Sequence, residues 1–226
     1  MDEEKFIIYE DANVIIINKP AGMVTTNEGR KENNSLENWL KINRPNELPR
    51  NGILHRLDKG TSGIVMTAKD EPSFEKMRQQ FKLRSIEKRY YALICGDLPF
   101  EGEINVPIIR SKFAFGKFSV GVDGKKALTQ FKTIKKMNIN GKIFSLVDIN
   151  LKTGRTHQIR VHMSYLRWPL AGDRLYGGQV IIGLDRPFLH AYQVSFDNPA
   201  SGERMMVKAE MPEELVNILK TYEPAA

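Results

Sequence analysis

The apolar residues of the chain fall into short runs of two kinds, one typical of strands and one typical of helices. Runs rich in β-branched residues at 5–9 and 14–17 predict two strands joined as a hairpin. Apolar residues that recur every three or four positions predict helices within 36–40, 74–81 and 215–222. Since most predicted strands are linked by turns, the pattern predicts an α+β fold with a largely antiparallel mixed sheet flanked by helices.

Turn and capping residues sharpen these boundaries. Ser35 and Asp70 each stand just before a helical pattern, where a short polar side chain can cap the first turn. Asn140 and Gly141 between two β-rich runs predict a tight hairpin. A final hairpin is expected from residues 188–196 and 204–207, on either side of a turn.

Two later segments combine such patterns with candidate chemistry. Residues 88–94 predict a strand in which the adjacent Tyr90 and Tyr91 point to opposite faces, so that one joins the core and the other faces a cleft. Thr156 is expected to cap a helix that contains Ile159 and Arg160 in its first turn. A cation there is disfavoured by the helix dipole unless it has an anionic partner, either from the protein or from a ligand phosphate. The alternative is that Arg160 projects into water.

Composition suits one soluble domain over residues 1–226. Hydrophobic residues make up 41% and charged residues 27% of the chain. The 34 Lys and Arg residues exceed the 27 Asp and Glu residues, which gives a formal net charge of +7. Such a surplus favours a polyanionic partner, although many basic proteins carry one only for solubility.

The single cysteine and the N-terminal residues indicate the cellular compartment of the protein. Cys95 lies in an apolar run and is expected to be a buried small hydrophobe, and it has no second cysteine with which to form an internal disulfide. The first five residues are acidic and lack a signal-peptide core, and no apolar run approaches the roughly 20 residues that span a bilayer. We therefore expect a cytoplasmic protein without a membrane partner.

The stretch 52–63 is the densest in candidate chemistry. It places the carboxylate of Asp58 between Arg56 and Lys59, with glycines on both sides. A carboxylate in such a loop is either a catalytic group or one half of a surface ion pair. Lys19, at the end of an early strand, is either a phosphate contact or a solvated strand end. Because His157 and His162 are five positions apart and have no further ligand at metal spacing, no metal site is expected.

Several strings together resemble one known family. Residues 55–63, His-Arg-Leu-Asp-Lys-Gly-Thr-Ser-Gly, are similar to the central motif of the RluA family of pseudouridine synthases. The family's other motifs follow the same order here, at residues 18–22, 88–90, 154–162 and 169–173. The resemblance implies the pseudouridine synthase fold and an enzyme, an isomerase that converts uridines of RNA into pseudouridines without cofactor or metal.

The same resemblance assigns the role of one residue, and the residue types at the motif positions then suggest roles for five others. It makes Asp58 the nucleophile, acting on a nucleotide that has been flipped out of the RNA stack. Arg160 is expected to keep Asp58 ionised, since burial alone would raise a carboxyl pKa. The remaining expected substrate contacts are Tyr90 stacking on the uracil, Ile159 closing the pocket, Arg56 filling the vacated stack and Lys19 near phosphate.

Two departures and two alternatives qualify the prediction. Arg167 and Trp168 stand where the family commonly has Gly-His, and the N-terminal RNA-binding domain of many members is not recognisable. We expect a monomer that acts on tRNA, rRNA or both. One alternative is an RNA-binding or chaperone-like protein that keeps the fold without turnover. Another is a base-excising enzyme, which would release free uracil.

Overall fold

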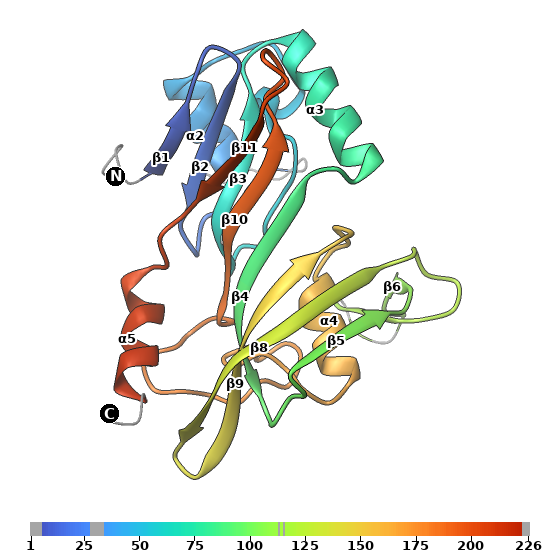
Figure 1. Cartoon of the computed structure of the whole chain (residues 1–226), viewed down its shortest axis with the longest axis vertical. Coiled ribbons are helices and arrows are strands. Elements are labelled where there is room, and N and C mark those ends of the chain that lie inside the picture. Colours follow the sequence, from blue (N-terminus) through green and yellow to red (C-terminus); the bar gives the residue numbers. More distant parts are fainter. Residues whose placement is uncertain (1–5, 28–33, 113, 115, 223–226) are drawn as a thin grey trace. The chain divides into compact units, whose positions relative to one another are not determined.

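The computed structural model describes residues 6–27, 34–112, 114 and 116–222. The chain divides into two compact units, each described here by itself. The first unit comprises Met1–Lys88 and Ala191–Glu210, and the second comprises Arg89–His190 and Met211–Ala226. Figure 1 gives the element labels used below. The expectation that residues 1–226 form a single domain stays a prediction.

The first unit is built on strands in the order β1-β2-β3-β10, with β11 paired to β10. The pairs β1–β2, β2–β3 and β10–β11 are antiparallel, so the predicted opening and closing hairpins are both confirmed. The strands are β1 (Ile7–Glu10), β2 (Val14–Lys19), β3 (Ser62–Ala68), β10 (Leu189–Asp197) and β11 (Arg204–Lys208).

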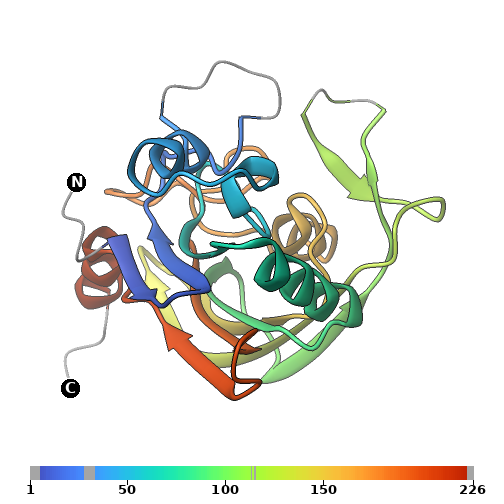
Figure 2. The same cartoon turned by 90° about the horizontal axis from the view of Figure 1, so that it is seen from above.

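The helices of this unit begin where the capping residues predict. In α2 (Leu36–Asn43) the Ser35 hydroxyl accepts from the Asn38 N–H at 3.1 Å, and in α3 (Glu71–Leu83) Asp70 accepts from the Ser73 N–H at 2.9 Å. A short 3-10 helix, η1 (Pro49–Gly52), leads toward the central stretch. Helix α3 packs against β3 (Figure 2) and buries Met77 in the core of the unit.

The second unit holds an antiparallel meander in the order β4-β9-β8-β5 and a separate hairpin of β6 and β7. Asn140 and Gly141 join β8 to β9 with φ values of 51° and 78°, the conformation that a two-residue hairpin turn requires. The strands are β4 (Glu87–Cys95), β5 (Glu101–Asn105), β6 (Ile108–Arg110), β7 (Phe118–Val120), β8 (Leu128–Ile139) and β9 (Lys142–Leu151).

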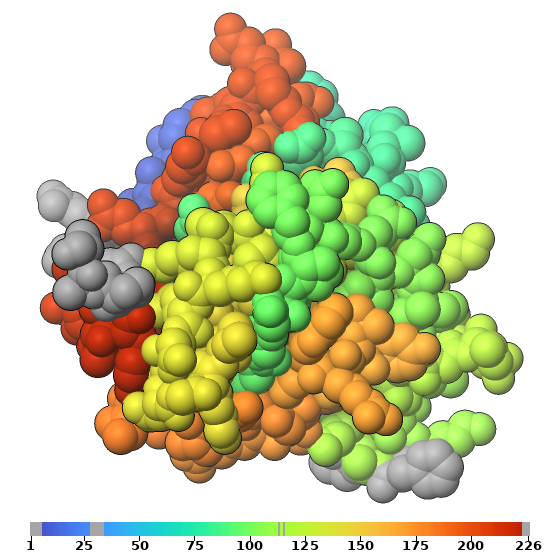
Figure 3. Space-filling model, turned by 60° about the horizontal axis from the view of Figure 1, so that its bottom comes forward, coloured from blue at the N-terminus to red at the C-terminus, as the bar shows by residue number. Residues whose placement is uncertain are grey.

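Helix α5 (Glu213–Thr221) closes the core of the second unit. Leu215 and Ile218 pack in one cluster with Met137 and Phe144 from the β8–β9 hairpin, and Figure 3 shows the red helix beside the yellow hairpin. Cys95 is buried in the same cluster, as predicted. Among the residues described here, no helix is long and apolar enough to cross a membrane.

Helix α4 (Gln158–Tyr165) corrects one expectation, since Thr156 does not cap it. The N-cap is His157, which has φ 55° and makes no side-chain capping bond. Instead the Gln158 side-chain oxygen accepts from the Arg155 N–H at 3.0 Å and from the Thr153 hydroxyl at 2.7 Å. The preceding loop is therefore held by a glutamine inside the helix, which a search for capping residues ahead of the helix does not detect.

Candidate active site

Asp58 lies in a loop of the first unit that runs back along β3. The loop follows Leu54, whose N–H donates to the Met66 carbonyl at 3.0 Å, and turns where the Thr61 N–H donates to the Asp58 carbonyl at 3.0 Å. Arg56 is exposed, Leu57 is buried and Asp58 is half-buried. This alternation is that of an extended segment, in which side chains two positions apart, such as those of Arg56 and Asp58, leave the same side.

The segment 20–25 fixes the backbone on both sides of Asp58. The buried Thr25 hydroxyl donates to the Leu57 carbonyl at 2.8 Å and accepts from the Leu57 N–H at 3.1 Å. On the other side, the Gly22 N–H donates to the Lys59 carbonyl at 2.8 Å. Because the two residues that flank Asp58 are both held, the position of its α-carbon is set by hydrogen bonds to a neighbouring loop.

Lys19 organises that neighbouring loop. Its side chain is fully buried, and its Nζ donates to the carbonyl oxygens of Pro20 at 2.9 Å and Met23 at 2.8 Å. The interpretation of Lys19 as a solvated strand end is therefore wrong, because the carbonyl groups replace water around the ammonium. Its expected contact with a phosphate stays a prediction.

The two glycines that bracket the central stretch allow close approach of backbones. A Cβ at Gly52 would lie 2.0 Å from the Ala68 carbonyl oxygen, and one at Gly63 would lie 2.2 Å from that of Ala191. Both glycines also have positive φ, at 79° and 114°. The absence of a side chain at these two positions lets the chain pass close to the backbone of Ala68 before the Asp58 loop and close to that of Ala191 after it.

His55, at the start of the central motif, has a structural role that sequence analysis missed. Its Nε2 accepts from the Met66 N–H at 3.2 Å, which requires the neutral ring. Burial, together with the charge of Lys88, lowers the pKa of His55 to about 3. Burial and the nearby Arg84 lower the pKa of Lys88 in turn to about 8. The imidazole is thus a neutral acceptor that ties the loop to β3.

The second unit contains the other three predicted residues. Tyr90 on β4 is buried while Tyr91 is half-buried, consistent with the expectation that they face opposite ways. Ile159 and Arg160 are neighbours in the first turn of α4, and both are buried. The three side chains come from two elements, a strand and a helix.

Arg160 has the anionic partner that its place in the helix calls for. Its Nε and Nη2 donate to the two carboxylate oxygens of Asp173 at 2.6 and 2.9 Å, an ion pair in which Asp173 is 1% exposed. The guanidinium also lies 4.9 Å from the centre of the Tyr176 ring. The partner is a protein carboxylate 13 positions along the chain, so of the two alternatives the one in which Arg160 projects into water is wrong.

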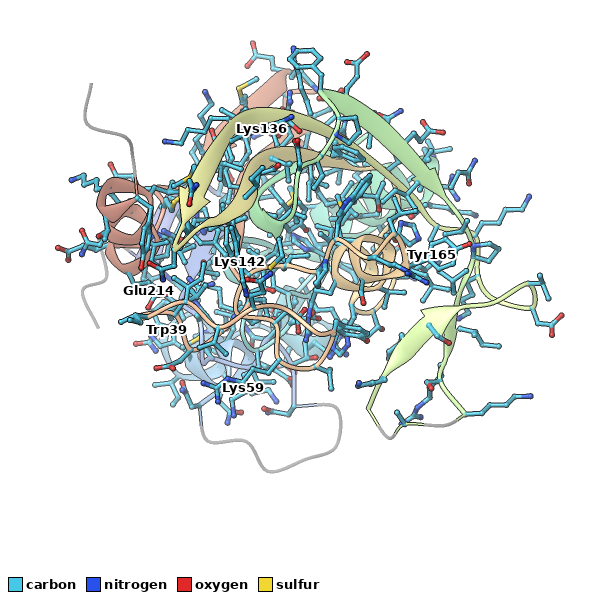
Figure 4. The ribbon with its side chains drawn as sticks, turned by 90° about the horizontal axis from the view of Figure 1, so that it is seen from below. Trp39, Lys59, Lys136, Lys142, Tyr165 and Glu214 are labelled. Atoms are coloured by element: carbon cyan, nitrogen blue, oxygen red, sulfur yellow. The ribbon has the colours of Figure 1, made fainter. Side chains whose placement is uncertain are left out.

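In the first unit, Lys19 ends β2, and the segment 20–25 that follows it bonds to the loop that carries Arg56 and Asp58. In the second unit, Ile159 and Arg160 are neighbours in α4. Figure 4 labels Lys59, next to Asp58 in the chain, and Tyr165 at the end of α4. That all six predicted residues serve one reaction stays a prediction.

The two histidines of the motif at residues 154–162 make structural contacts. The ring nitrogens of His162 lie 2.9 Å from the Thr129 hydroxyl and 3.0 Å from the Val106 carbonyl oxygen. His157 Nδ1 lies 2.9 Å from the Tyr176 hydroxyl. In the described part of the chain, no three His, Cys, Asp or Glu side chains gather as metal ligands would. That the reaction proceeds without a metal or cofactor stays a prediction.

Comparison with known proteins supports the resemblance seen in the sequence. Residues 13–165 match the family model described as RNA pseudouridylate synthase. The chain is 36% identical over 220 residues to the uncharacterized RNA pseudouridine synthase YlyB of Bacillus subtilis, covering 95% of this chain and 71% of that protein. It is 35% identical over 230 residues to ribosomal large subunit pseudouridine synthase D of Vibrio vulnificus, covering 95% and 70%.

Solved structures agree with these matches. Human RNA pseudouridylate synthase domain containing 1 superposes with a TM-score of 0.76 at 26% identity, covering 97% of this chain and 88% of that one. Human RNA pseudouridylate synthase domain containing 4 shares the fold, with a TM-score of 0.72 at 23% identity over 98% and 95%. The predicted α+β pseudouridine synthase fold is confirmed. The chain belongs to the RNA pseudouridylate synthase family and is an RNA pseudouridine synthase.

Proposed function

We propose that this enzyme isomerises uridines of rRNA, tRNA or both, with Asp58 as the nucleophile on a nucleotide turned out of the RNA stack. The observation that carries the proposal is the anchoring of Asp58. The Thr25 hydroxyl and the Gly22 N–H bond to the backbone of the residues on either side of it, while the Asp58 side chain keeps partial exposure. A reacting group benefits from such a fixed position, because misplacement by about 1 Å can cost roughly 100-fold in rate.

The reaction leaves the elemental composition of the RNA unchanged. The bond between the anomeric carbon and the ring nitrogen N1 breaks, the base turns, and carbon 5 forms the new bond to the sugar. Carbon 5 loses its hydrogen and N1 gains one, so no group is added to the RNA and no electrons are exchanged with a cofactor. A carboxylate that attacks the nucleotide can hold the intermediate while the base turns.

Arg56 is proposed to occupy the gap that the extruded base leaves. It is exposed, and it points to the same side of the loop as Asp58 because the buried Leu57 separates them. A planar guanidinium stacks on bases, which an ammonium cannot do. Arg56 would offset part of the few kcal/mol that extrusion costs.

The remaining roles follow from the family resemblance. Tyr90 is proposed to stack on the uracil, Ile159 to exclude water from the reacting base and Arg160 to hold the negative charge of Asp58. Asp173 binds one edge of the Arg160 guanidinium at two points and so presets the direction in which its other N–H groups point. Lys19 is proposed to act close to an RNA phosphate.

The substrate class rests on two observations. The net charge of +7 favours a polyanion. The relatives from Vibrio vulnificus and from Neisseria meningitidis are named ribosomal large subunit pseudouridine synthase D, which favours rRNA over tRNA as the substrate to test first.

Loss of the carbon 5 hydrogen gives a direct test. RNA labelled with tritium at carbon 5 of its uridines should release tritium to water with the wild-type enzyme, and the mass of an unlabelled RNA should stay unchanged. Asp58→Asn should reduce release by at least about 10³-fold, as is typical when a nucleophile is removed. RNA affinity should stay within a few-fold. Asp185→Asn is the matched control, since that side chain is fully exposed.

Two results would overturn the proposal. Appreciable tritium release by Asp58→Asn would remove Asp58 from the nucleophilic role. Free uracil, with its tritium retained, would indicate base excision instead of isomerisation.

A further inference from the structure

The β6–β7 hairpin of the second unit borders a cavity of about 430 Å³. The hairpin contributes Arg110 and Phe118, the turn after it contributes Asp123 and Lys125, and the loop before α4 contributes Arg155. Strand β7 contacts α4, and Figures 1 and 4 show the hairpin and the helix in this unit. The volume lies within the range of pockets that bind small organic groups.

The charged side chains around the cavity favour an anion. Three are cations, from Arg110, Lys125 and Arg155, and one is the carboxylate of Asp123, so the lining carries a net charge of 3 − 1 = +2. Arg155 is held by a bond from its Nε to the Lys126 carbonyl at 3.0 Å, which orients its guanidinium. Cations gathered around a cavity are typical of phosphate contacts, and an oriented guanidinium can bind a phosphate through two N–H groups.

Phe118 and Gly154 in the lining favour a ligand that carries a ring as well as a phosphate. The half-buried ring of Phe118 lines the cavity, and a base can stack on such a ring. At Gly154, also in the lining, an added Cβ would meet no protein atom within 4 Å, and φ is not in the positive region. The fold itself therefore does not require glycine there, and the space stays available for a ligand to approach the backbone.

A chain of contacts joins this wall to Arg160 within the same unit. The Phe118 N–H donates to the Tyr176 hydroxyl at 2.9 Å, and His157 Nδ1 lies 2.9 Å from the same oxygen. The Phe118 and His157 rings also form a T-shaped pair, with centroids 5.7 Å apart. Since the Arg160 guanidinium lies 4.9 Å from the Tyr176 ring centre, the cavity wall and the first turn of α4 are held as one assembly.

We propose that this cavity is a second RNA-contact site, which holds one phosphate and one base of a nucleotide other than the reacting uridine. Arg110, Lys125 and Arg155 contact the phosphate, and Phe118 stacks on the base. The proposal rests on the proposed function for its substrate class, RNA, and adds a binding site that the roles of Asp58 and its partners do not include.

Equilibrium binding in a salt series tests the site. The probes are oligouridines of about 4 and about 16 nucleotides, which bracket the site sizes of single-strand binders. With the longer probe, Lys125→Ala should lower the slope of log affinity against log salt by about 1. Lys220→Ala on α5 removes the same charge from an exposed position elsewhere in the unit and should change the slope by less.

Stacking is tested separately. Phe118→Leu should weaken binding of the longer probe by about 5- to 100-fold, the usual loss for one base–aromatic stack. Phe100→Leu is the matched control, because Phe100 is 64% exposed and outside the cavity lining. Thermal melting of each variant establishes that the fold is kept. If Phe118→Leu does not fold, the comparison of Lys125→Ala with Lys220→Ala alone tests the site.

The outcomes separate this site from the proposed chemistry, because binding is measured without turnover. Equal effects of Lys125→Ala and Lys220→Ala, or of Phe118→Leu and Phe100→Leu, would overturn the cavity as an RNA site whatever the role of Asp58. Retained tritium release by Asp58→Asn would overturn the nucleophile and leave these binding results standing.

Discussion

The Asp58 loop and the first turn of α4 hold their charged residues in opposite ways. Around Asp58, the structure anchors the backbone of the neighbouring residues through Thr25 and Gly22. Around Arg160, it anchors the side chain itself through a two-point ion pair with Asp173. A side chain on an anchored backbone can be replaced with little effect on folding. A buried side chain that neutralises a partner cannot, because its loss leaves the other charge uncompensated.

The largest effect is expected from breaking the ion pair. Asp173→Ala should lower the free energy of unfolding by about 3 to 5 kcal/mol, since it leaves the buried Arg160 guanidinium without this partner. Urea unfolding measures the change, with Asp185→Ala as the exposed control. A loss of less than about 1 kcal/mol in the free energy of unfolding would mean that the ion pair is no more important for folding than the Asp58 side chain.

Removing the Thr25 hydroxyl, which makes two hydrogen bonds to the Leu57 backbone, should lower the reaction rate more than the stability of the fold. Thr25→Val keeps the shape but loses both hydrogen bonds to Leu57, so kcat on tritiated RNA should fall by about 10- to 100-fold with KM little changed. Thr25→Ser restores the hydroxyl and should recover most of the rate. If Thr25→Val unfolds readily and its kcat is normal, the hydroxyl serves folding and does not position Asp58.

His55 should make the first region sensitive to acid. Its pKa is about 3 in the folded protein and near 6.5 when unfolded, so the unfolded chain binds the proton first as pH falls. Stability is therefore unaffected by this residue above pH 6.5 and declines between pH 6.5 and 3, by up to about 2 kcal/mol at pH 5.

His55→Gln isolates that contribution from other titrations. A glutamine can still accept from the Met66 N–H but does not titrate. The melting temperature of this variant should fall less between pH 7 and pH 5 than that of the wild type. Parallel declines would show that the imidazole gains a proton in the folded state.

Substitution of Arg56 should have the smallest effect on the rate, and the size of the effect should depend on the structure of the RNA. Arg56→Ala should slow single turnover by about tenfold on a uridine in a stacked stem–loop, and by less at a mismatch, where extrusion costs less. Arg56→Lys should recover little of the rate. An equal defect on both RNAs would assign Arg56 to the chemical step or to holding Asp58.

Local sequence signals located most of the elements correctly. Ser35, Asp70, Asn140 and Gly141 act within three or four positions of themselves, and each did what its residue type predicts. The opening and final hairpins follow from the same short-range logic. Asp58 is a candidate only through the motif around it, because its local composition fits a surface turn equally well.

The errors and omissions involve contacts over longer separations. Lys19 does end a strand but is not solvated there, because the carbonyl oxygens of Pro20 and Met23 surround its ammonium, and nothing in the neighbouring sequence indicates this. Asp173 lies 13 positions from Arg160, outside any helical or strand spacing, so the ion pair could not be predicted. Thr156 failed as a cap because Gln158, inside the helix, holds the preceding loop.

The buried state of Cys95 has a practical consequence for experiments on this enzyme. It is the only cysteine, it is 5% exposed, and burial raises the pKa of its thiol, so it should react slowly with maleimides. A cysteine introduced at an exposed position, such as Lys220, could therefore be labelled selectively without first removing the native one. Two such positions, one in each unit, would carry a dye pair that reports by energy transfer whether RNA binding changes the distance between them.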